Sequence, residues 1–453
     1  MITKWYQKTA ALLISLAMVL SACGSGADQS SGNNKGADQN AEKVVHLNFW
    51  GAIPPETGPQ ELVDAWNKAN PNIQVTYTRF VNDDSGNTKL ETALIAGNVD
   101  VFINYSWQVM QKRIANKLLE PLDPFIEKDK LNLEEEFGKH PYVINGKRYF
   151  IPTLGGSNAF IMYNKNMVEA AGVKIPDHWT WDDYIKIAKQ LTKGEGNNKV
   201  YGSIMHTAGD SWAAPAMTLL NGDYTYKEGK QESNFDHPAF LKSLQIRYQM
   251  ENIDKSQVPL IEMKASKMDP AAEYTKGKVA MINNMNFLLR DIRNTEKYPH
   301  DFITAFAPMP VLDNNQKEVW SGGLREWIAI SPQSANKEAA WKFLKYYAME
   351  GYYPMIKSIR IPAWKKANPE NIVKMFLGED RDKLFDVDSF TKYVLNNPMH
   401  RNLERNRTEA AAKILQIMTE ESEKALLNEQ SVEDAIKNMK KRADEAIKAE
   451  TNS

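Results

Sequence analysis

The chain has 453 residues, of which 42% are apolar and 25% are charged, and its formal net charge at pH 7 is −1. Such a composition can form ordinary hydrophobic cores, and a chain of this length is expected to divide into at least two domains. The near-neutral charge argues against a nucleic-acid partner and against a polybasic membrane patch. Because Cys23 is the only cysteine, no disulfide is available, and stability must come from the size of the cores.

The N-terminal segment has the pattern of a lipoprotein signal peptide. Lys4 and Lys8 precede an apolar run over residues 9–22, which is shorter than the roughly 20 residues that a membrane-spanning helix needs. The run ends in Leu-Ser-Ala-Cys, which resembles a bacterial lipobox whose cysteine, here Cys23, is lipidated. We therefore expect a signal peptide at residues 1–22 and a mature chain tethered through Cys23. The alternative is an ordinary signal peptide in which this cysteine occurs by chance.

A linker is expected to follow the lipidated cysteine. Residues 24–40 contain only Gly, Ser, Ala, Asn, Asp, Gln and one Lys, a composition that cannot bury enough apolar surface to order itself. Residues 23–43 are thus predicted to be a flexible, lipid-anchored linker, which as a coil would span roughly 20–25 Å.

Strand and helix patterns then alternate along the chain. Apolar runs predict strands, helical spacing of apolar residues predicts helices, and Pro71 and Gly97 end the two helices. The elements are a strand at 44–50, a helix at 60–70, a strand at 73–77, a helix at 88–96 and a strand at 99–103. This β-α-β-α-β order predicts a parallel sheet covered by helices.

Local turn and capping signals continue downstream. Asn145-Gly146 predicts a hairpin turn. Thr180 followed by Asp183, and Ser431 followed by Asp434, predict capping boxes at the starts of two helices.

Several separated segments together resemble the motifs of one family. They are Ala-Gly-Asn-Val-Asp-Val-Phe at 96–102, Leu-Glu-Pro-Leu-Asp at 119–123, Asn-Gly-Lys-Arg-Tyr-Phe-Ile-Pro at 145–152, Met-Tyr-Asn-Lys at 162–165, Thr-Trp-Asp-Asp at 180–183, Gly-Lys-Val-Ala-Met at 277–281, Ala-Pro-Met-Pro at 307–310 and Ser-Ala-Asn-Lys-Glu-Ala-Ala-Trp-Lys-Phe-Leu at 334–344. In this order they resemble the family 1 extracellular solute-binding proteins, the maltodextrin-binding group that serves ABC importers. Val99 departs from the pattern, in which Pro is usual.

The resemblance implies an α/β fold of the two-lobed periplasmic-binding-protein type, with a ligand cleft between lobes that close by a hinge. The first lobe would comprise residues 44–155 and 325–375. The second would comprise residues 156–324 and 376–453.

Candidate ligand contacts follow from the rule that open α/β sheets bind ligands beyond the carboxyl ends of their strands. Sugars are recognised by aromatic faces and by amide, carboxylate or guanidinium groups at their hydroxyls. Trp107 is the leading candidate because it lies in a predicted loop that matches the family's contact loop. The candidates after strands or in loops are Trp50, Asn104, Tyr105, Trp107, Trp212 and Trp327. Trp50 could equally pack beneath the sheet end, while Trp66 and Trp341 have the helical spacing of core residues.

Further candidates are implied by their place in the resemblance. Ser157 and Asn158 fall at the first crossing between lobes, Gly323 and Arg325 at the second. The others are Asn283, Asn286, Phe287 and Arg360. Phe287 stands where the family often has a stacking aromatic, and the two arginines could equally form surface or interlobe salt bridges.

Together with the family resemblance, these observations predict a lipid-anchored, monomeric receptor that binds a carbohydrate, specifically an oligosaccharide, and delivers it to an ABC permease. We expect no metal, cofactor or nucleic acid. Gly24 after the lipidated cysteine favours the outer face of a single-membrane bacterium. One alternative is a lipid-anchored hydrolase, although Gly-x-Ser-x-Gly, His-Glu-x-x-His and Walker motifs do not occur. A surface adhesion lipoprotein is the other.

Overall fold

The computed structural model describes residues 44–140, 142–155, 159–220, 224–227, 230–283, 286–317, 319–321, 323–396 and 410–451. The predicted signal peptide, Cys23 and the linker lie outside the described residues, as do Ser157 and Asn158. None of the helices within the described ranges is long and apolar enough to cross a membrane.

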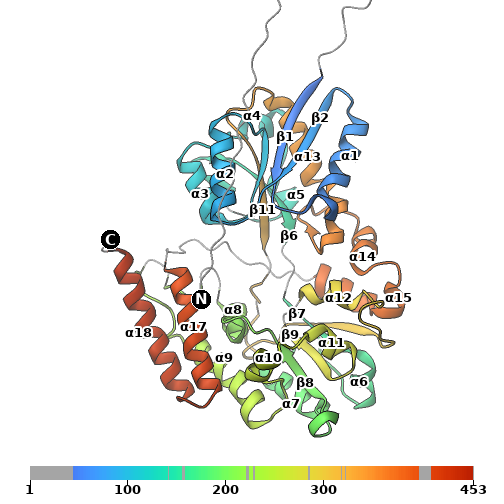
Figure 1. Cartoon of the computed structure of the whole chain (residues 1–453), viewed down its shortest axis with the longest axis vertical. Coiled ribbons are helices and arrows are strands. Elements are labelled where there is room, and N and C mark those ends of the chain that lie inside the picture. The colour runs from blue at the N-terminus through green and yellow to red at the C-terminus, as the bar shows by residue number, and fades with distance from the viewer. Residues whose placement is uncertain are drawn as a thin grey trace, which may run out of the picture. The chain divides into compact units, whose positions relative to one another are not determined.

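The first lobe is built on a six-stranded sheet (Figure 1). Its strands, in spatial order, are β12 (Ile361–Pro362), β6 (Ile151–Gly155), β11 (Leu324–Ile330), β3 (Val101–Asn104), β1 (Val45–Gly51) and β2 (Ile73–Arg79). The strand β1 pairs in parallel with β2 and β3, which confirms the predicted β-α-β-α-β unit. By contrast, β11 runs antiparallel to both of its neighbours, β3 and β6.

Helices and a small hairpin surround this sheet. They are η1 (Pro55–Thr57), α1 (Pro59–Ala69), α2 (Asp84–Ile95), α3 (Trp107–Ala115), α4 (Asp123–Lys128), α5 (Leu133–Phe137), the hairpin of β4 (Val143–Ile144) and β5 (Lys147–Arg148), α13 (Lys337–Ala348) and η6 (Glu350–Ser358). The hairpin turns at Asn145-Gly146 as predicted. Trp66 and Trp341 are 5% and 2% exposed and belong to the core of this lobe, which confirms their predicted structural role.

The second lobe is built on a four-stranded sheet. Its strands, in spatial order, are β10 (Thr304–Pro308), β7 (Phe160–Asn164), β9 (Val279–Asn283) and β8 (Tyr201–Met205). The strand β7 is antiparallel to β10 and β9, whereas β8 and β9 are parallel.

Helices and short turns accompany the second sheet. They are α6 (Lys165–Ala170), α7 (Trp181–Leu191), η2 (Gly196–Asn198), η3 (Ser211–Ala213), α8 (Ala214–Leu219), α9 (Pro238–Tyr248), the π turn η4 (Gln249–Ile253), α10 (Leu260–Ser266), α11 (Pro270–Thr275), η5 (Asn286–Leu288), α12 (Leu289–Ile292), α14 (Pro369–Leu377), α15 (Arg381–Leu384), α16 (Val387–Phe390), the π turn η7 (Thr391–Leu395), α17 (Ala411–Leu426) and α18 (Val432–Thr451). The predicted capping box of Thr180 and Asp183 begins α7.

The core packing differs from the predicted lobe boundaries at one place. The helix α14 places Ile372, Val373, Phe376 and Leu377 in a cluster with Phe160 of the second sheet. The predicted boundary at residue 375 assigns most of this helix to the first lobe, which its packing contradicts. The apolar side of the helix meets the second core, and sequence spacing alone does not say which core a helix joins.

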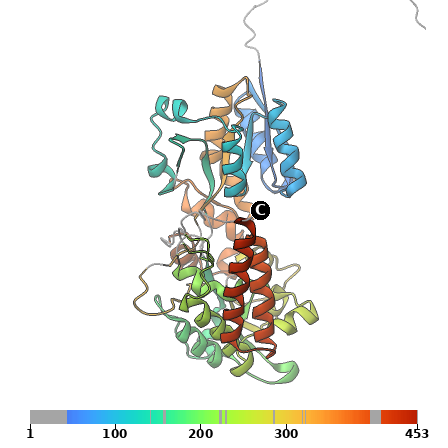
Figure 2. The same ribbon diagram turned by 90° about the vertical axis from the view of Figure 1, so that its left-hand side faces the viewer.

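The C-terminal helices α17 and α18 lie side by side as a hairpin (Figure 2) and share an apolar core. A buried carboxylate, Glu421, also links them. The side chain of Glu421 is 2% exposed. It accepts hydrogen bonds from Lys424 at 2.9 Å, Gln430 at 2.9 Å and Arg442 at 2.5 Å. Burial opposes its ionisation, but these three donors outweigh burial and lower the pKa of Glu421 to about 2.

We predict that Glu421→Gln lowers the free energy of unfolding at pH 7 by about 2–3 kcal/mol. The folded pKa of Glu421 lies below that of the unfolded chain, so its contribution is present above the unfolded value of about 4.3 and is lost as the pH falls towards 2. Urea unfolding of both proteins should therefore show a difference at pH 7 that shrinks at pH 3. The more exposed partner of Arg442 provides the control, because Glu420→Gln should change stability little. An equal loss in both variants would contradict the role of burial.

Candidate ligand-binding site

The two sheets are connected so that their strand ends meet. The chain leaves the first sheet at Gly155, the end of β6, and enters the second at Phe160, the start of β7. The parallel strands β1 and β3 end at the same edge of the first sheet as β6. In the second sheet, Ile161 near the start of β7 pairs with Asn283, which also pairs with Met205 at the end of β8. The strand ends of both lobes that commonly bind ligands thus lie at edges joined by one short crossing.

On the first lobe, two tyrosines fix the loop that follows β1. The hydroxyl of Tyr105 accepts a hydrogen bond from the Ala52 amide at 2.8 Å, and the hydroxyl of Tyr77 donates to the Ile53 carbonyl at 2.7 Å. Burial raises the pKa of both phenols, so they remain neutral. A Cβ atom at Gly51 would lie 2.8 Å from the Tyr77 hydroxyl, so any side chain there would displace this hydroxyl. The hydroxyl of the predicted ligand contact Tyr105 is therefore engaged within the protein.

A strained, buried carboxylate lies where the crossing segments join the first lobe. Glu326 in β11 has a φ of 53°, a left-handed conformation that costs a non-glycine residue roughly 1–2 kcal/mol. Its side chain is 8% exposed and accepts hydrogen bonds from Arg360 Nη2 at 3.2 Å and Nε at 3.3 Å. Burial raises the pKa of Glu326, and the charge of Arg360 opposes this shift. Arg360 is thus engaged in an ion pair with a buried carboxylate, whereas the predicted alternative to a ligand contact is a surface or interlobe salt bridge.

On the second lobe, an exposed aromatic ring and an unpaired amide lie at the strand edge. Phe287 is 46% exposed, and its ring packs edge-on against His206 at 5.5 Å between centroids. Asn283 is fully buried, and among the described residues neither its Oδ1 nor its Nδ2 has a hydrogen-bond partner. Burial, together with the charge of Arg247, lowers the pKa of His206. This edge therefore offers an aromatic face and an imidazole, and the amide of Asn283 is buried at the end of the strand that leads to them.

A buried ion pair supports the His206 loop. Arg247, 1% exposed, donates to Ser211 Oγ at 2.7 Å and to the His206 carbonyl at 3.4 Å. Its Nε donates to Glu251 at 2.7 Å. Ser211 Oγ in turn donates to the His206 carbonyl at 2.6 Å. The loop is therefore held by charged groups that are themselves buried.

Four predicted contacts lie in hydrophobic or polar cores instead of at a surface. They are Asn104, Trp107, Trp212 and Trp327, with exposed fractions of 0%, 7%, 1% and 3%. Asn104 accepts from Arg113 at 2.9 Å and donates to the Trp327 carbonyl at 3.3 Å. Trp212 packs against Phe240 in the core of α8, α9 and the C-terminal hairpin.

The prediction that Trp107 lies in a loop is wrong. Ser106 caps a helix that begins at Trp107, and its hydroxyl accepts from the Val109 amide at 3.4 Å. The indole of Trp107 then packs against Phe150 and Trp327 at 5.7 and 5.3 Å between centroids. Trp327 donates to Nε2 of His140 at 3.2 Å, and burial lowers the pKa of His140 to about 3, which keeps this acceptor neutral. Trp107 is a core residue of the first lobe.

The remaining candidates lie at or near the joined edges. Trp50 is half-buried against the first core, one residue before the end of β1. Gly323, with a φ of 92°, immediately precedes β11, and Arg325 at its start is exposed. Asn286 begins η5, but its side chain is not among those described.

Sequence reasoning missed His206, Glu326 and Tyr77. His206 follows β8 directly, so the rule that selected Asn104 could have found it once the strand was recognised. Glu326 gave no signal, because its importance comes from a backbone conformation and from Arg360, 34 residues away. Among the described residues, no cluster of three or more His, Cys, Asp and Glu could hold a metal ion.

Comparison with known proteins identifies a single family to which this chain is similar. The family model for bacterial extracellular solute-binding proteins matches residues 53–353. An arabinooligosaccharide-binding protein of Bacillus subtilis is 30% identical over 259 residues, which are 55% of this chain and 54% of that protein.

Solved structures of low identity share the fold. A sugar transporter from Rhizobium etli, in an open conformation, has a TM-score of 0.72 at 19% identity and covers 90% of this chain and 100% of its own. An ABC substrate-binding protein from Listeria monocytogenes, in complex with cycloalternan, has a TM-score of 0.66 at 23% identity with the same coverage of both chains.

Because Trp107 is buried and Phe287 is exposed, we predict that removing their side chains lowers stability by very different amounts. Trp107→Ala should lower the free energy of unfolding by about 3–5 kcal/mol, because it empties a site in the first core. Phe287→Ala should change it by less than about 0.5 kcal/mol, because the ring is largely exposed. Urea denaturation of the ligand-free proteins measures both values. If the Trp107→Ala protein were as stable as the original, the placement of Trp107 in the core would be wrong.

Proposed function

Because this chain belongs to the bacterial extracellular solute-binding protein family, we propose that it captures a carbohydrate, specifically an oligosaccharide, and delivers it to an ABC permease. The observation that carries the proposal is the meeting of the two strand edges at the crossing from Gly155 to Phe160. A solute bound there contacts both lobes, so its binding can be coupled to their closure. The arabinooligosaccharide-binding relative supports the choice of an oligosaccharide.

The side chains at these edges have the chemistry that saccharides require. The exposed face of Phe287 can pack against an apolar sugar face, and His206 beside it can hydrogen-bond a hydroxyl. Asn283, buried at the end of the preceding strand, has an amide whose donors and acceptor lack partners among the described residues. From the first lobe, Trp50 and Arg325 complete the proposed contact set.

We propose that the lobes close by a hinge at the crossing segments. Thr153 Oγ1 donates to the Glu326 carbonyl at 2.8 Å, and the Ala159 amide donates to Ser321 Oγ at 3.1 Å. These bonds join neighbouring crossings, while the left-handed backbone at Glu326 stores strain beside them. Changes in φ and ψ at a few such positions are sufficient for hinge closure.

The receptor is further proposed to be a monomer that is anchored through Cys23, with residues 23–43 as the linker. A diacyl anchor holds a protein firmly at a membrane, whereas a single chain does so only marginally. The proposed location is the outer face of a single-membrane bacterium. We propose no enzymatic activity.

A thermal-shift and calorimetric screen of arabino-, malto- and xylo-oligosaccharides and cyclic glucans tests the function. The bound sugar at a hundredfold excess over its dissociation constant should add about 2.7 kcal/mol of stability. Phe287→Ala should weaken binding roughly ten- to a hundredfold, by analogy with bases stacked on aromatic rings. Ile95→Ala removes an exposed side chain at the end of α2 and serves as the matched control with unchanged affinity.

Two outcomes would contradict this assignment. One is that no saccharide stabilises the protein. The other is chromatographic evidence that the bound oligosaccharide is cleaved, with the cleavage abolished by a single Asp or Glu substitution, which would make the protein a hydrolase.

The anchor is tested by Cys23→Ala expressed in a single-membrane bacterium. We expect this protein to appear in the medium instead of in the membrane fraction, because the linker has no apolar surface of its own. Ser25→Ala should leave the protein in the membrane fraction. Retention of Cys23→Ala at the membrane would show that the lipobox assignment is wrong.

A further inference from the structure

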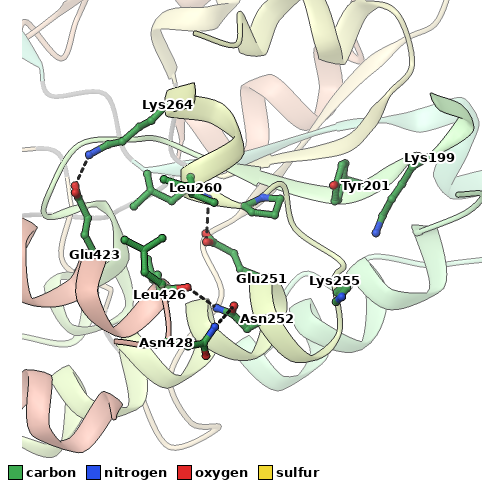
Figure 3. Close-up of a pocket in the computed structure, with 13 residues that line it drawn as sticks. Lys199, Tyr201, Glu251, Asn252, Lys255, Leu260, Lys264, Glu423, Leu426 and Asn428 are labelled. Atoms are coloured by element: carbon green, nitrogen blue, oxygen red, sulfur yellow. Dashed lines mark hydrogen bonds and ion pairs between the residues drawn. The ribbon is translucent and has the colours of Figure 1, made fainter. Parts of the chain in front are cut away.

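A pocket lies in the second lobe, away from the joined edges (Figure 3). Its volume is about 520 Å³, within the range of small-molecule sites. It is formed by the start of β8, the π turn η4, the loop that leads to α10, and the C-terminal end of α17.

The pocket is separate from the proposed solute site. Tyr201, which lines it, begins β8, whereas His206 follows the last residue of the same strand. At about 3.3 Å per residue, the strand separates these ends by roughly 13 Å. The pocket therefore opens at the opposite end of the second sheet.

One side of the pocket is apolar. Leu260 and Leu426 form its buried part, and Ile261 and Leu427 extend it with exposed fractions of 53% and 42%. Small-molecule sites are lined predominantly by apolar side chains of this kind. This side can receive a hydrocarbon chain or ring.

The other side carries two ammonium groups, neither of which has a carboxylate partner among the described residues. Figure 3 shows Lys199 and Lys255 together on the side away from Leu426. Neither makes an ion pair with the described part of the chain, and Lys199 lies over the Tyr201 ring at 4.6 Å. The hydroxyl of Tyr201 donates to Glu262 at 3.0 Å, but Glu262 does not line the pocket.

The two carboxylates of the pocket wall do not neutralise these lysines. Glu423 pairs with Lys264. Glu251 is buried and accepts from Arg247 Nε at 2.7 Å and from the Leu260 amide at 3.0 Å. The pocket thus keeps an excess of positive charge next to an apolar wall.

The backbone around the pocket is strained at two positions. Lys255 and Asn428 have φ values of 50° and 62°, in the left-handed region that non-glycine residues rarely adopt. The π turn η4 contributes Glu251 and Asn252 to the wall, and such turns occur frequently at functional sites. Backbone strain of this kind persists only where the surrounding structure enforces it, and such positions cluster at functional sites.

We propose that this pocket binds a small amphipathic anion, a carboxylate that carries an apolar chain or ring. The carboxylate lies between the ammonium groups of Lys199 and Lys255. The apolar part lies against Leu260, Ile261, Leu426 and Leu427. This proposal does not depend on the identity of the solute at the joined edges.

Calorimetric titration with octanoate, below the concentration at which it forms micelles, tests the pocket. We expect octanoate to bind the full-length protein more tightly than octanol or octylammonium, and its affinity to fall as salt is raised. Lys199→Gln with Lys255→Gln should weaken octanoate binding roughly three- to tenfold. Ile261→Ser should weaken it about threefold or more, since it removes apolar contact from an exposed side chain.

The matched control replaces two other exposed lysines, Lys68→Gln with Lys147→Gln, and changes the net charge by the same amount. We expect this variant to bind octanoate as the original protein does. Equal binding of octanol and octanoate, or equal loss in both double variants, would overturn the proposal. So would binding to phosphatidylglycerol vesicles without binding of monomeric octanoate, because that result would indicate a membrane surface as the partner.

Discussion

The pairing of β11 with both β3 and β6 is the constraint on which the rest of the structure depends. The strand β11 follows the four strands of the second sheet in sequence, yet it completes the centre of the first sheet. The chain must therefore leave the first lobe and return to it, and the pairing of Leu324 with Gly155 places both crossings side by side. The strand edges of the two lobes meet there as a direct consequence.

The crossings are held by polar contacts because several backbones approach closely. A Cβ atom at Gly155 would lie 2.7 Å from the Pro362 carbonyl oxygen, which explains the glycine. The Ala363 amide donates to the Thr153 carbonyl at 3.0 Å, and Arg360 reaches back to Glu326. Breaking one partner of a buried ion pair leaves an uncompensated charge, so Glu326 and Arg360 hold the strained strand β11 and the segment that leads into β12 together. The same groups border the proposed solute site.

Local sequence signals predicted the strands and helices of the first sheet. They failed to predict burial where it depends on residues distant in sequence. The spacing of β1 to β3, the turn at Asn145-Gly146 and the core positions Trp66 and Trp341 all depend on neighbours in sequence, and all are confirmed. The burial of Trp107 depends on Trp327, from the strand that returns after the second lobe. No periodicity around Trp107 contains that information. The family resemblance supplied the two-lobed fold, but residue exposure required the structure.

The buried amide of Asn283 affects both the stability of the ligand-free protein and its proposed function. A buried polar group without a partner costs about 1–3 kcal/mol, and an apolar side chain in its place would avoid that cost. Asn283 ends β9 at the joined edge, beside the turn that carries the exposed ring of Phe287. A site that must hydrogen-bond a hydroxyl discriminates strongly against ligands that lack it, because its own groups would remain unpaired. Asn283 therefore destabilises the ligand-free protein. A solute whose hydroxyl pairs with this amide would remove that cost, and a solute without a hydroxyl would not, which would make binding selective.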